Sequence, residues 1–144
     1  MPHYAELNEN NEVIYVAYMG DEIITDENGI EQEQMGIDHL HTNHGADRTW
    51  VRTSYRGRFR GNYAGIGDMY MPDVATLGVG STDIFIQQQP FDSWSIDANV
   101  AEWKSPLGDE PGLTTSQYDE GYYYEWDESA YQADNTQGWV LITP

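Results

Sequence analysis

A short basic stretch between Gly45 and Gly67 constrains the fold of this chain more than any other feature. It contains five of the six Lys and Arg residues, whereas eleven Asp and Glu residues lie within residues 1–47 and fourteen within 61–144. Charges of opposite sign are therefore segregated along the chain. A folded structure must either pair this stretch with the acidic remainder or present it to a partner.

The composition restricts the classes of protein to which the chain can belong. A length of 144 residues predicts a single domain, and an aromatic content of 13% separates the chain from disordered sequences, which are poor in aromatics. The formal net charge of −19 disfavours nucleic acid and anionic membranes as partners, because both are negatively charged. The absence of cysteine excludes disulfides, thiolate metal sites and cysteine catalysis.

The hydropathy of the chain predicts neither a membrane span nor a targeting segment. No apolar run approaches the roughly 20 residues that a membrane-spanning helix needs. The first residues lack the basic flank and the apolar run of a signal peptide. We therefore expect the protein to remain where it is synthesised, or to leave the cell inside an assembly.

The first part of the chain predicts a β-hairpin. Residues 3–8 alternate in polarity, Glu9–Asn11 form a turn cluster, and Val13–Met19 are a dense run of β-branched and aromatic residues. Because both faces of the second strand are apolar, we expect that strand to be central in a sheet or covered. Residues 20–29 are predicted to form a loop, with a short strand at Ile23–Thr25.

One helix is predicted over about residues 30–42, because apolar residues recur there at helical spacing. Gly36 weakens this prediction, since glycine inside a helix costs about 1 kcal/mol relative to alanine. Gly45 suits the left-handed position that follows a helix.

The basic stretch itself predicts a strand followed by a loop. Thr49–Tyr55 alternate, so Trp50, Arg52 and Ser54 are expected on one face of the strand. Residues 56–67 contain four glycines and are predicted to form a loop.

The remaining strands are predicted in pairs. One pair lies at residues 68–71 and 81–87, around a longer connection at Pro72–Gly80. The C-terminal third shows a weak internal repeat, in which a tryptophan strand, an acidic turn and a second tryptophan strand occur twice, within 93–106 and 124–142. Each repeat predicts a hairpin in which one tryptophan faces the other across the ladder.

These elements predict an α+β fold that is mainly β, with several antiparallel β-hairpins and one short helix. We expect residues 1–106 to form a β-rich core domain that contains the helix, and the Gly/Pro/Asp-rich residues 107–121 to form a linker or long loop. Residues 122–144 are expected to form a C-terminal tryptophan hairpin. Because an isolated hairpin is only marginally stable in water, it should pack on the core or on a neighbouring chain.

No catalytic constellation is visible in the sequence. His39, His41 and His44 match no strong metal-binding spacing and suit the C-terminal end of a helix. The carboxylate pair Asp109–Glu110, like others, lies in a predicted turn and not in the paired setting of a glycosidase. The glycines of the loop lack the Lys-Ser/Thr of a phosphate-binding motif. We therefore expect no enzymatic activity, no catalytic residue, no metal site and no cofactor.

The basic stretch permits three interpretations. Arginines with interleaved aromatic residues can bind single-stranded nucleic acid, which the net charge of −19 disfavours. They can pair internally with the acidic remainder, or they can dock on a carboxylate-rich partner, where arginine and aromatic rings are typical hot spots. The candidate partner-binding residues are Arg48, Trp50, Arg52, Arg56, Arg58, Phe59, Arg60 and Tyr63.

Four tryptophans of the C-terminal third form a second candidate surface. Exposed indole rings stack on sugars or form contacts between subunits. The candidates for glycan or inter-subunit contact are Trp94, Trp103, Trp126 and Trp139.

Several motifs along the chain belong together. They are His3-Tyr4-Ala5, T-W-V-R-T-S-Y at Thr49–Tyr55, R-G-N-Y-A-G-I-G at Arg60–Gly67, P-F-D-S-W-S-I-D at Pro90–Asp97 and Y-E-W-D-E at Tyr124–Glu128. This set resembles a family of short virion structural proteins from tailed phages that infect marine cyanobacteria and other marine bacteria. The resemblance covers nearly the whole chain and departs at Pro72–Gly80 and Ala130–Gln137.

The resemblance implies a virion structural protein without catalytic residues. We expect an accessory decoration protein on the exterior of the capsid, assembled into the virion in the host cytoplasm. Its expected partners are the major capsid protein, other virion proteins or further copies of itself, and neither nucleic acid nor membrane. The alternatives are a tail, neck or fibre-associated virion component and, from another class, a carbohydrate-binding module.

Overall fold

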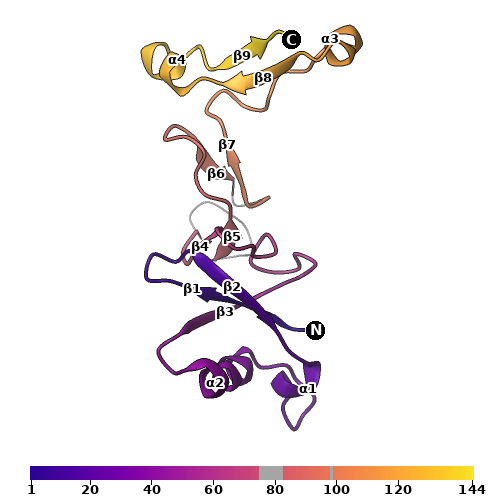
Figure 1. Cartoon of the computed structure of the whole chain (residues 1–144), viewed down its shortest axis with the longest axis vertical. Helices are drawn as coiled ribbons and strands as arrows, with labels where there is room; N and C mark the ends of the chain where they lie inside the picture. Colours follow the sequence, from indigo (N-terminus) through magenta and orange to yellow (C-terminus); the bar gives the residue numbers. More distant parts are fainter. Residues whose placement is uncertain (75–82, 98) are drawn as a thin grey trace. The chain divides into compact units, whose positions relative to one another are not determined.

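The structure of the chain, a computed structural model, describes residues 1–74, 83–97 and 99–144. The regular elements among these residues are small antiparallel sheets and four short helices, so the predicted α+β, mainly β fold class is confirmed. The chain forms two compact units (Figure 1). The first contains Met1–Gln88 and Ile96–Glu102, and the second contains Gln89–Ser95 and Trp103–Pro144.

The first unit is built on a three-stranded antiparallel sheet with the strand order β2-β1-β3. The middle strand β1 (His3–Leu7) pairs with β2 (Val13–Tyr18) on one side and with β3 (Thr49–Thr53) on the other. The predicted hairpin of the first two strands is therefore confirmed.

The prediction that the second strand of this hairpin is central or covered was wrong. β2 is an edge strand of the sheet, and β1 is the central one. Tyr4 and Ala5 of β1 are fully buried, whereas Ile14, Tyr15 and Tyr18 of β2 are exposed. The alternation of β1 indicated a half-buried strand, but elements distant in sequence cover both of its faces, so tertiary packing overrides the local pattern.

Each face of this sheet has its own hydrophobic cluster. Two helices, α1 (Asp21–Ile24) and α2 (Glu33–His44), lie on one side of the sheet (Figure 1). The cluster with these helices contains Tyr4, Ala17, Met19, Ile24, Leu40 and Trp50. The other cluster contains Ala5, Leu7, Val13, Ala64 and Phe85. Burying one large apolar side chain stabilises a fold by about 1.5–3 kcal/mol, so the two clusters are the main source of stability of this unit.

The predicted helix over 30–42 is confirmed as α2, although it begins later, at Glu33. Thr25 and Glu31 form an antiparallel bridge, which keeps the backbone extended up to Gln32. The short strand predicted at Ile23–Thr25 was wrong for its first two residues, because Ile23 and Ile24 belong to α1.

Two glycines shape α2. Gly36 is buried against the ring of Tyr4, and a Cβ atom at this position would collide with that ring. Gly45 ends the helix with a φ of +115°, a conformation that favours glycine, and its N–H donates to the His41 carbonyl. The expected helix end at Gly45 is therefore confirmed.

A two-stranded sheet completes the first unit. β4 (Met69–Met71) pairs antiparallel with β5 (Ile84–Ile86), as predicted for this part of the chain. All three residues of β5 are buried. The connection predicted at Pro72–Gly80 lies largely outside the described residues.

The second unit contains a tryptophan hairpin. β8 (Tyr123–Trp126) pairs with β9 (Trp139–Ile142), and Trp126 lies opposite Trp139, so the predicted cross-strand tryptophan pair is confirmed. A separate two-stranded sheet, formed by β6 (Ser95–Asp97) and β7 (Glu102–Lys104), precedes this hairpin in the sequence, and Ile96–Glu102 belong to the first unit. Trp94 lies just before β6, so the first tryptophan strand predicted within 93–106 does not contain its tryptophan.

Two short helices of the second unit differ from the prediction. α3 (Thr115–Asp119) lies within the segment predicted to be a linker, residues 107–121, and begins with a capping box formed by Thr114 and Gln117. α4 (Glu128–Ala133) lies between β8 and β9, where the Asp127 side chain accepts a hydrogen bond from the backbone of Ala130. Both helices form because capping side chains satisfy their first N–H groups.

Candidate docking surface

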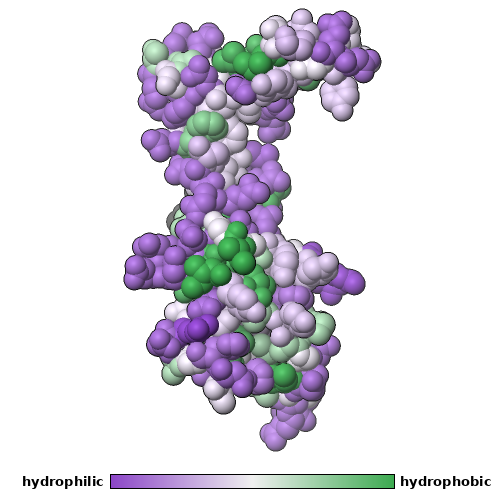
Figure 2. Space-filling view, in the orientation of Figure 1, coloured by the Kyte–Doolittle hydropathy of each residue, from purple (hydrophilic) through white to green (hydrophobic). Residues whose placement is uncertain are grey.

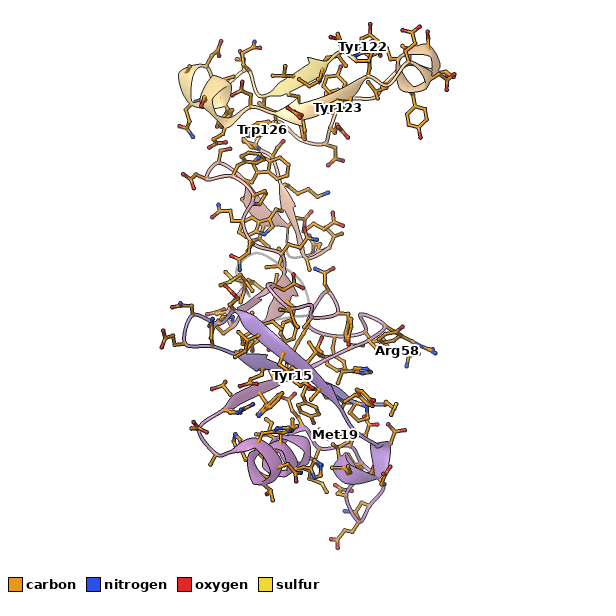
Figure 3. All side chains as sticks on the ribbon, viewed as in Figure 1. Tyr15, Met19, Arg58, Tyr122, Tyr123 and Trp126 are labelled. Carbon is orange, nitrogen blue, oxygen red and sulfur yellow. The ribbon has the colours of Figure 1, made fainter. Side chains whose placement is uncertain are left out.

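The loop after β3 presents two arginines to solvent. The Gly57 N–H donates to the Ser54 carbonyl at 3.0 Å, and the Arg58 N–H donates to the Ser54 hydroxyl at 2.9 Å. Gly57 has a φ of +63°, which lets the chain turn sharply between the two arginines. Arg56 and Arg58 are exposed, and neither forms an ion pair with a described residue. Figure 3 shows Arg58 projecting away from the ribbon.

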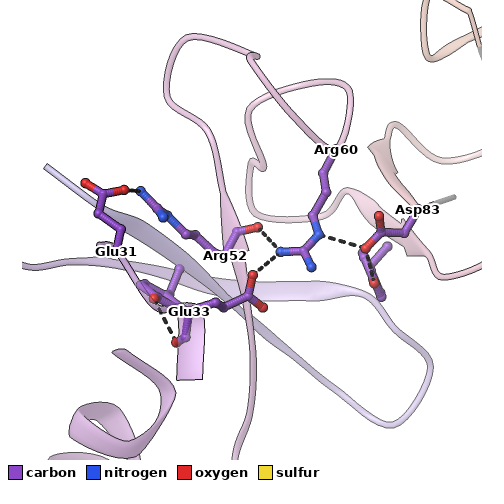
Figure 4. Close-up of polar contacts among 7 residues, drawn as sticks. Glu31, Glu33, Arg52, Arg60 and Asp83 are labelled. Carbon is purple, nitrogen blue, oxygen red and sulfur yellow. Dashed lines mark hydrogen bonds and ion pairs between the residues drawn. The ribbon is translucent and has the colours of Figure 1, made fainter. Parts of the chain in front are cut away.

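The other three arginines of the basic stretch pair within the unit. Arg48 contacts Glu6 at 3.2 Å, and Arg52 contacts Glu31 at 2.8 Å. Arg60 forms ion pairs with two carboxylates that lie far apart in the sequence, Glu33 and Asp83 (Figure 4). Three arginines of the basic stretch therefore pair internally, whereas Arg56 and Arg58 are presented to solvent.

Arg60 is the centre of this ionic network. Its Nη1 donates to Glu33 and, at 3.0 Å, to the Arg52 carbonyl, while its Nε donates to Asp83 at 2.7 Å. The Tyr70 hydroxyl donates to the same Asp83 oxygen at 2.6 Å. Burial opposes the charge on Arg60, but the hydrogen bonds and charges of Glu33 and Asp83 outweigh that effect, so the pKa of Arg60 is raised. Burial, reinforced by Asp83, also raises the pKa of Tyr70.

A groove of about 620 Å³ lies beside the exposed arginines. We call it the Arg–aromatic groove; its lining residues are Met1, Pro2, His3, Glu31, Arg52, Thr53, Ser54, Tyr55, Arg56, Arg58 and Phe59. The Arg52 guanidinium lies 5.4 Å from the centre of the Phe59 ring, a cation–π contact. Arg52 Nε and His3 Nδ1 are buried and lack a hydrogen-bond partner among the described residues.

Aromatic rings continue along one side of this groove. The ring of Tyr55 stacks on His3 with the centroids 5.5 Å apart and meets Tyr63 edge-on at 5.2 Å. Tyr55 is 67% exposed and Tyr63 is 37% exposed. Burial, together with the neighbouring Tyr55, raises the pKa of Tyr63. Apolar ring area and guanidinium charge therefore lie next to each other on the surface of the first unit.

Trp50 does not belong to this surface. It is only 3% exposed and packs in the hydrophobic cluster beneath α2, although the sequence predicted it on the docking face. The expected alternation of β3 holds, but the face that carries Trp50 is the one that α2 covers. Of the candidate partner-binding residues, Arg56, Arg58 and Phe59 are exposed on the groove.

Three of the candidate tryptophans pack on one another inside the second unit. The ring of Trp126 lies 5.7 Å from that of Trp94 and 5.3 Å from that of Trp139, both edge-on, and Trp126 is only 8% exposed. Such edge-to-face pairs stabilise a core beyond the area that they bury. Trp126 is thus a core member, Trp94 and Trp139 are half-buried against it, and the three do not form a flat exposed platform, while Trp103 is half-buried in β7.

Glu128 connects this tryptophan cluster to the preceding segment. Its carboxylate accepts hydrogen bonds from the Ser93 hydroxyl at 2.6 Å, the Ser93 N–H at 3.1 Å and Trp126 Nε1 at 2.9 Å. These donors, led by the Ser93 hydroxyl and Trp126, lower the pKa of Glu128 to about 2. The motifs that contain Ser93 and Glu128 thus meet in one structural contact.

The histidines of α2 do not converge. His41 Nε2 lies 2.8 Å from the Arg48 carbonyl, and His39 contacts Asn43. The described residues contain no group of three or more His, Asp or Glu side chains placed to hold a metal ion. None of the described helices is long and apolar enough to span a membrane.

No protein-family model, curated protein or solved structure matches the chain.

Proposed function

We propose that this chain is an accessory virion structural protein of a tailed phage, which decorates the exterior of the capsid and docks through the Arg–aromatic groove. The motif resemblance motivates the virion role, and one observation carries the docking surface. In a chain with a net charge of −19, Arg56 and Arg58 form no ion pair with a described residue and border a groove with exposed aromatic rings.

The contrast among the arginines supports a docking role. With 25 Asp and Glu residues available, internal partners neutralise Arg48, Arg52 and Arg60. The loop holds Arg56 and Arg58 away from these partners through the hydrogen bonds to Ser54. Structural needs of the unit therefore do not account for the two exposed charges.

The groove suits a partner with carboxylates and apolar side chains. A guanidinium binds a carboxylate through two parallel hydrogen bonds, and each charge-assisted bond contributes about 1.5–3 kcal/mol when water is excluded. The rings of Tyr55 and Phe59 supply the apolar area that excludes water around such contacts. Most of the face drawn in Figure 2 is hydrophilic. The acidic residues outside the basic stretch would face solvent, where high ionic strength screens their mutual repulsion.

A tail, neck or fibre-associated position would use the same groove and is distinguished from capsid decoration by copy number. The carbohydrate-binding alternative lacks a supporting observation, because Trp94, Trp126 and Trp139 pack against one another.

The test uses a phage that lacks the gene and is complemented with variants of the chain. The double variant Arg56→Gln/Arg58→Gln should fold normally and be lost from purified particles by about tenfold or more, as expected when two charged contacts are removed. Arg60 remains unchanged in this test, because it holds the first unit together.

A matched control separates docking from net charge. Asn10→Glu/Asn135→Glu makes the chain more acidic by the same two charges at exposed positions that do not line the groove, and should be incorporated normally. Normal incorporation of the arginine variant would refute docking through this groove.

A further inference from the structure

The edge strand β2 carries backbone groups at Val16 and Tyr18 that point away from β1 and form no hydrogen bond with a described residue. The Met19 N–H donates to the Pro2 carbonyl at 3.1 Å, so at Met19 the strand points its polar groups toward β1. Because these groups alternate along an antiparallel strand, those of Tyr18 and Val16 point away from β1. Val13, at the start of the strand, bonds instead to Gly67 and Asp68.

The outward groups of Val16 and Tyr18 receive no hydrogen bond from the part of the chain that the structure describes. The opposite edge of the sheet differs. There, the outward carbonyl of Arg52 accepts a hydrogen bond from Arg60. One edge of the sheet is therefore occupied at this carbonyl, while the β2 edge is open at Val16 and Tyr18 as far as the described residues extend.

β2 also lacks the features by which proteins protect an open edge. The run Val13–Met19 contains no charged residue and no proline, although 22% of the chain is charged. Tyr15 is 51% exposed and Tyr18 is 67% exposed. Uncharged, β-branched and aromatic edge strands pair readily with other strands, which is why lysine or proline usually interrupts them.

A hollow extends along this edge on the α2 side. It has a volume of about 230 Å³, and its lining residues are Tyr15, Ala17, Tyr18, Met19, His39, Leu40, Asn43 and His44. Figure 3 shows Tyr15 on β2 and Met19 directly after it. A strand added beside β2 would place the side chains of one face into this hollow.

We propose that β2 pairs antiparallel with β2 of a second copy, around a two-fold axis close to Ala17. An antiparallel edge is self-complementary, because the same row of donors and acceptors meets itself. The open groups of Val16 and Tyr18 are centred on Ala17, so this pairing sets Val16 of each copy opposite Tyr18 of the other, within the uncharged run Val13–Met19. Glu12 and Asp21 then lie beyond the paired segment.

The absence of charged residues on β2 allows two acidic copies to approach each other at this edge. Copies with a net charge of −19 repel each other, and β2 provides a continuous segment where two copies meet without opposing carboxylates. Salt should therefore strengthen the dimer, since the screening length falls from about 10 Å at 0.1 M to about 3 Å at 1 M.

The test is analytical ultracentrifugation of the whole chain at increasing protein concentration, in about 0.1 M and about 1 M NaCl. The wild-type chain should form a dimer that is favoured at high salt. Val16→Pro removes an outward N–H, which an edge strand tolerates, and should weaken the dimer about tenfold or more. Ile30→Ser removes an exposed apolar side chain in the segment before α2, outside the β2 edge and the hollow, and should leave the dimer unchanged.

If Val16→Pro fails to fold, amide hydrogen exchange of the wild-type chain tests whether β2 pairs with β2 of a second copy. Exchange at Val16 and Tyr18 should slow as protein concentration rises. A chain that stays monomeric in high salt would overturn the proposal, and would leave the edge for a strand of a different protein. A dimer that forms without protecting these two amides, or that survives in folded Val16→Pro, would also overturn it.

Discussion

Replacing Arg60 by glutamine should destabilise the first unit, whereas the same change at Arg58 should not. Arg60 joins Glu33 at the start of α2 to Asp83 beside β5, and it also binds the Arg52 carbonyl of β3 (Figure 4). Its loss would leave two carboxylates close together without their shared cation. Arg58 forms no comparable contact among the described residues.

The expected magnitude follows from how exposed these groups are. The side chain of Arg60 is 23% exposed, that of Asp83 is 19% exposed and that of Glu33 is 34% exposed. Breaking a fully buried ion pair costs roughly 3–5 kcal/mol, and an exposed pair contributes roughly 0–1 kcal/mol. For this partly buried network we expect about 2–3 kcal/mol, which lowers the melting temperature of a unit of this size by roughly 10–20 °C.

The indole N–H signals of the tryptophans in NMR spectra can measure this loss separately for each unit. Trp50 lies in the first unit, whereas the other four tryptophans belong to the second. Arg60→Gln should lower the melting temperature reported by Trp50, and Arg58→Gln should change stability by less than about 0.5 kcal/mol. An Arg60→Gln variant as stable as the wild type, or an equal loss in Arg58→Gln, would refute the division between structural and docking arginines.

Two further changes test other contacts of the fold. Glu128→Gln should lower the stability of the second unit at neutral pH, because hydrogen bonds lower the pKa of Glu128 from 4.5 to about 2, and that contribution is present above pH 4.5 and lost as the pH falls toward 2. Thermal denaturation of wild type and variant should therefore differ at pH 7 and converge near pH 2; a constant difference would contradict the role of the carboxylate. Gly36→Ala should destabilise the first unit by about 1–3 kcal/mol, because the added methyl group collides with Tyr4. Gly112→Ala, where the methyl group meets no described atom within 4 Å, is the control in urea denaturation, and equal stability of the two variants would contradict the close packing.

The sequence predicted the elements that local patterns define. The hairpin of β1 and β2, the pairing of β4 with β5 and the Trp126–Trp139 pair all follow from runs of strand-forming residues separated by turn residues. Helices α3 and α4 were missed because each has fewer than seven residues. The capping box of Thr114 and Gln117 is the sequence signal that could have revealed α3.

The placement of single residues depended on distant partners and could not be read locally. Gly36 weakens a helix in isolation, but its missing side chain makes space for the fully buried Tyr4. Trp50 has the chemistry of a binding hot spot, yet α2 covers its face of β3. Arg60 differs from Arg58 only because Glu33 and Asp83 come close to it in the folded unit.

Quantitative mass spectrometry of purified phage particles tests the central claim most directly. We expect this chain in intact virions at a fixed ratio to the major capsid protein, in hundreds of copies for capsid decoration. A fixed but much smaller number would instead place it in the tail or neck. Absence of the chain from purified particles would contradict the proposed role as a virion structural protein.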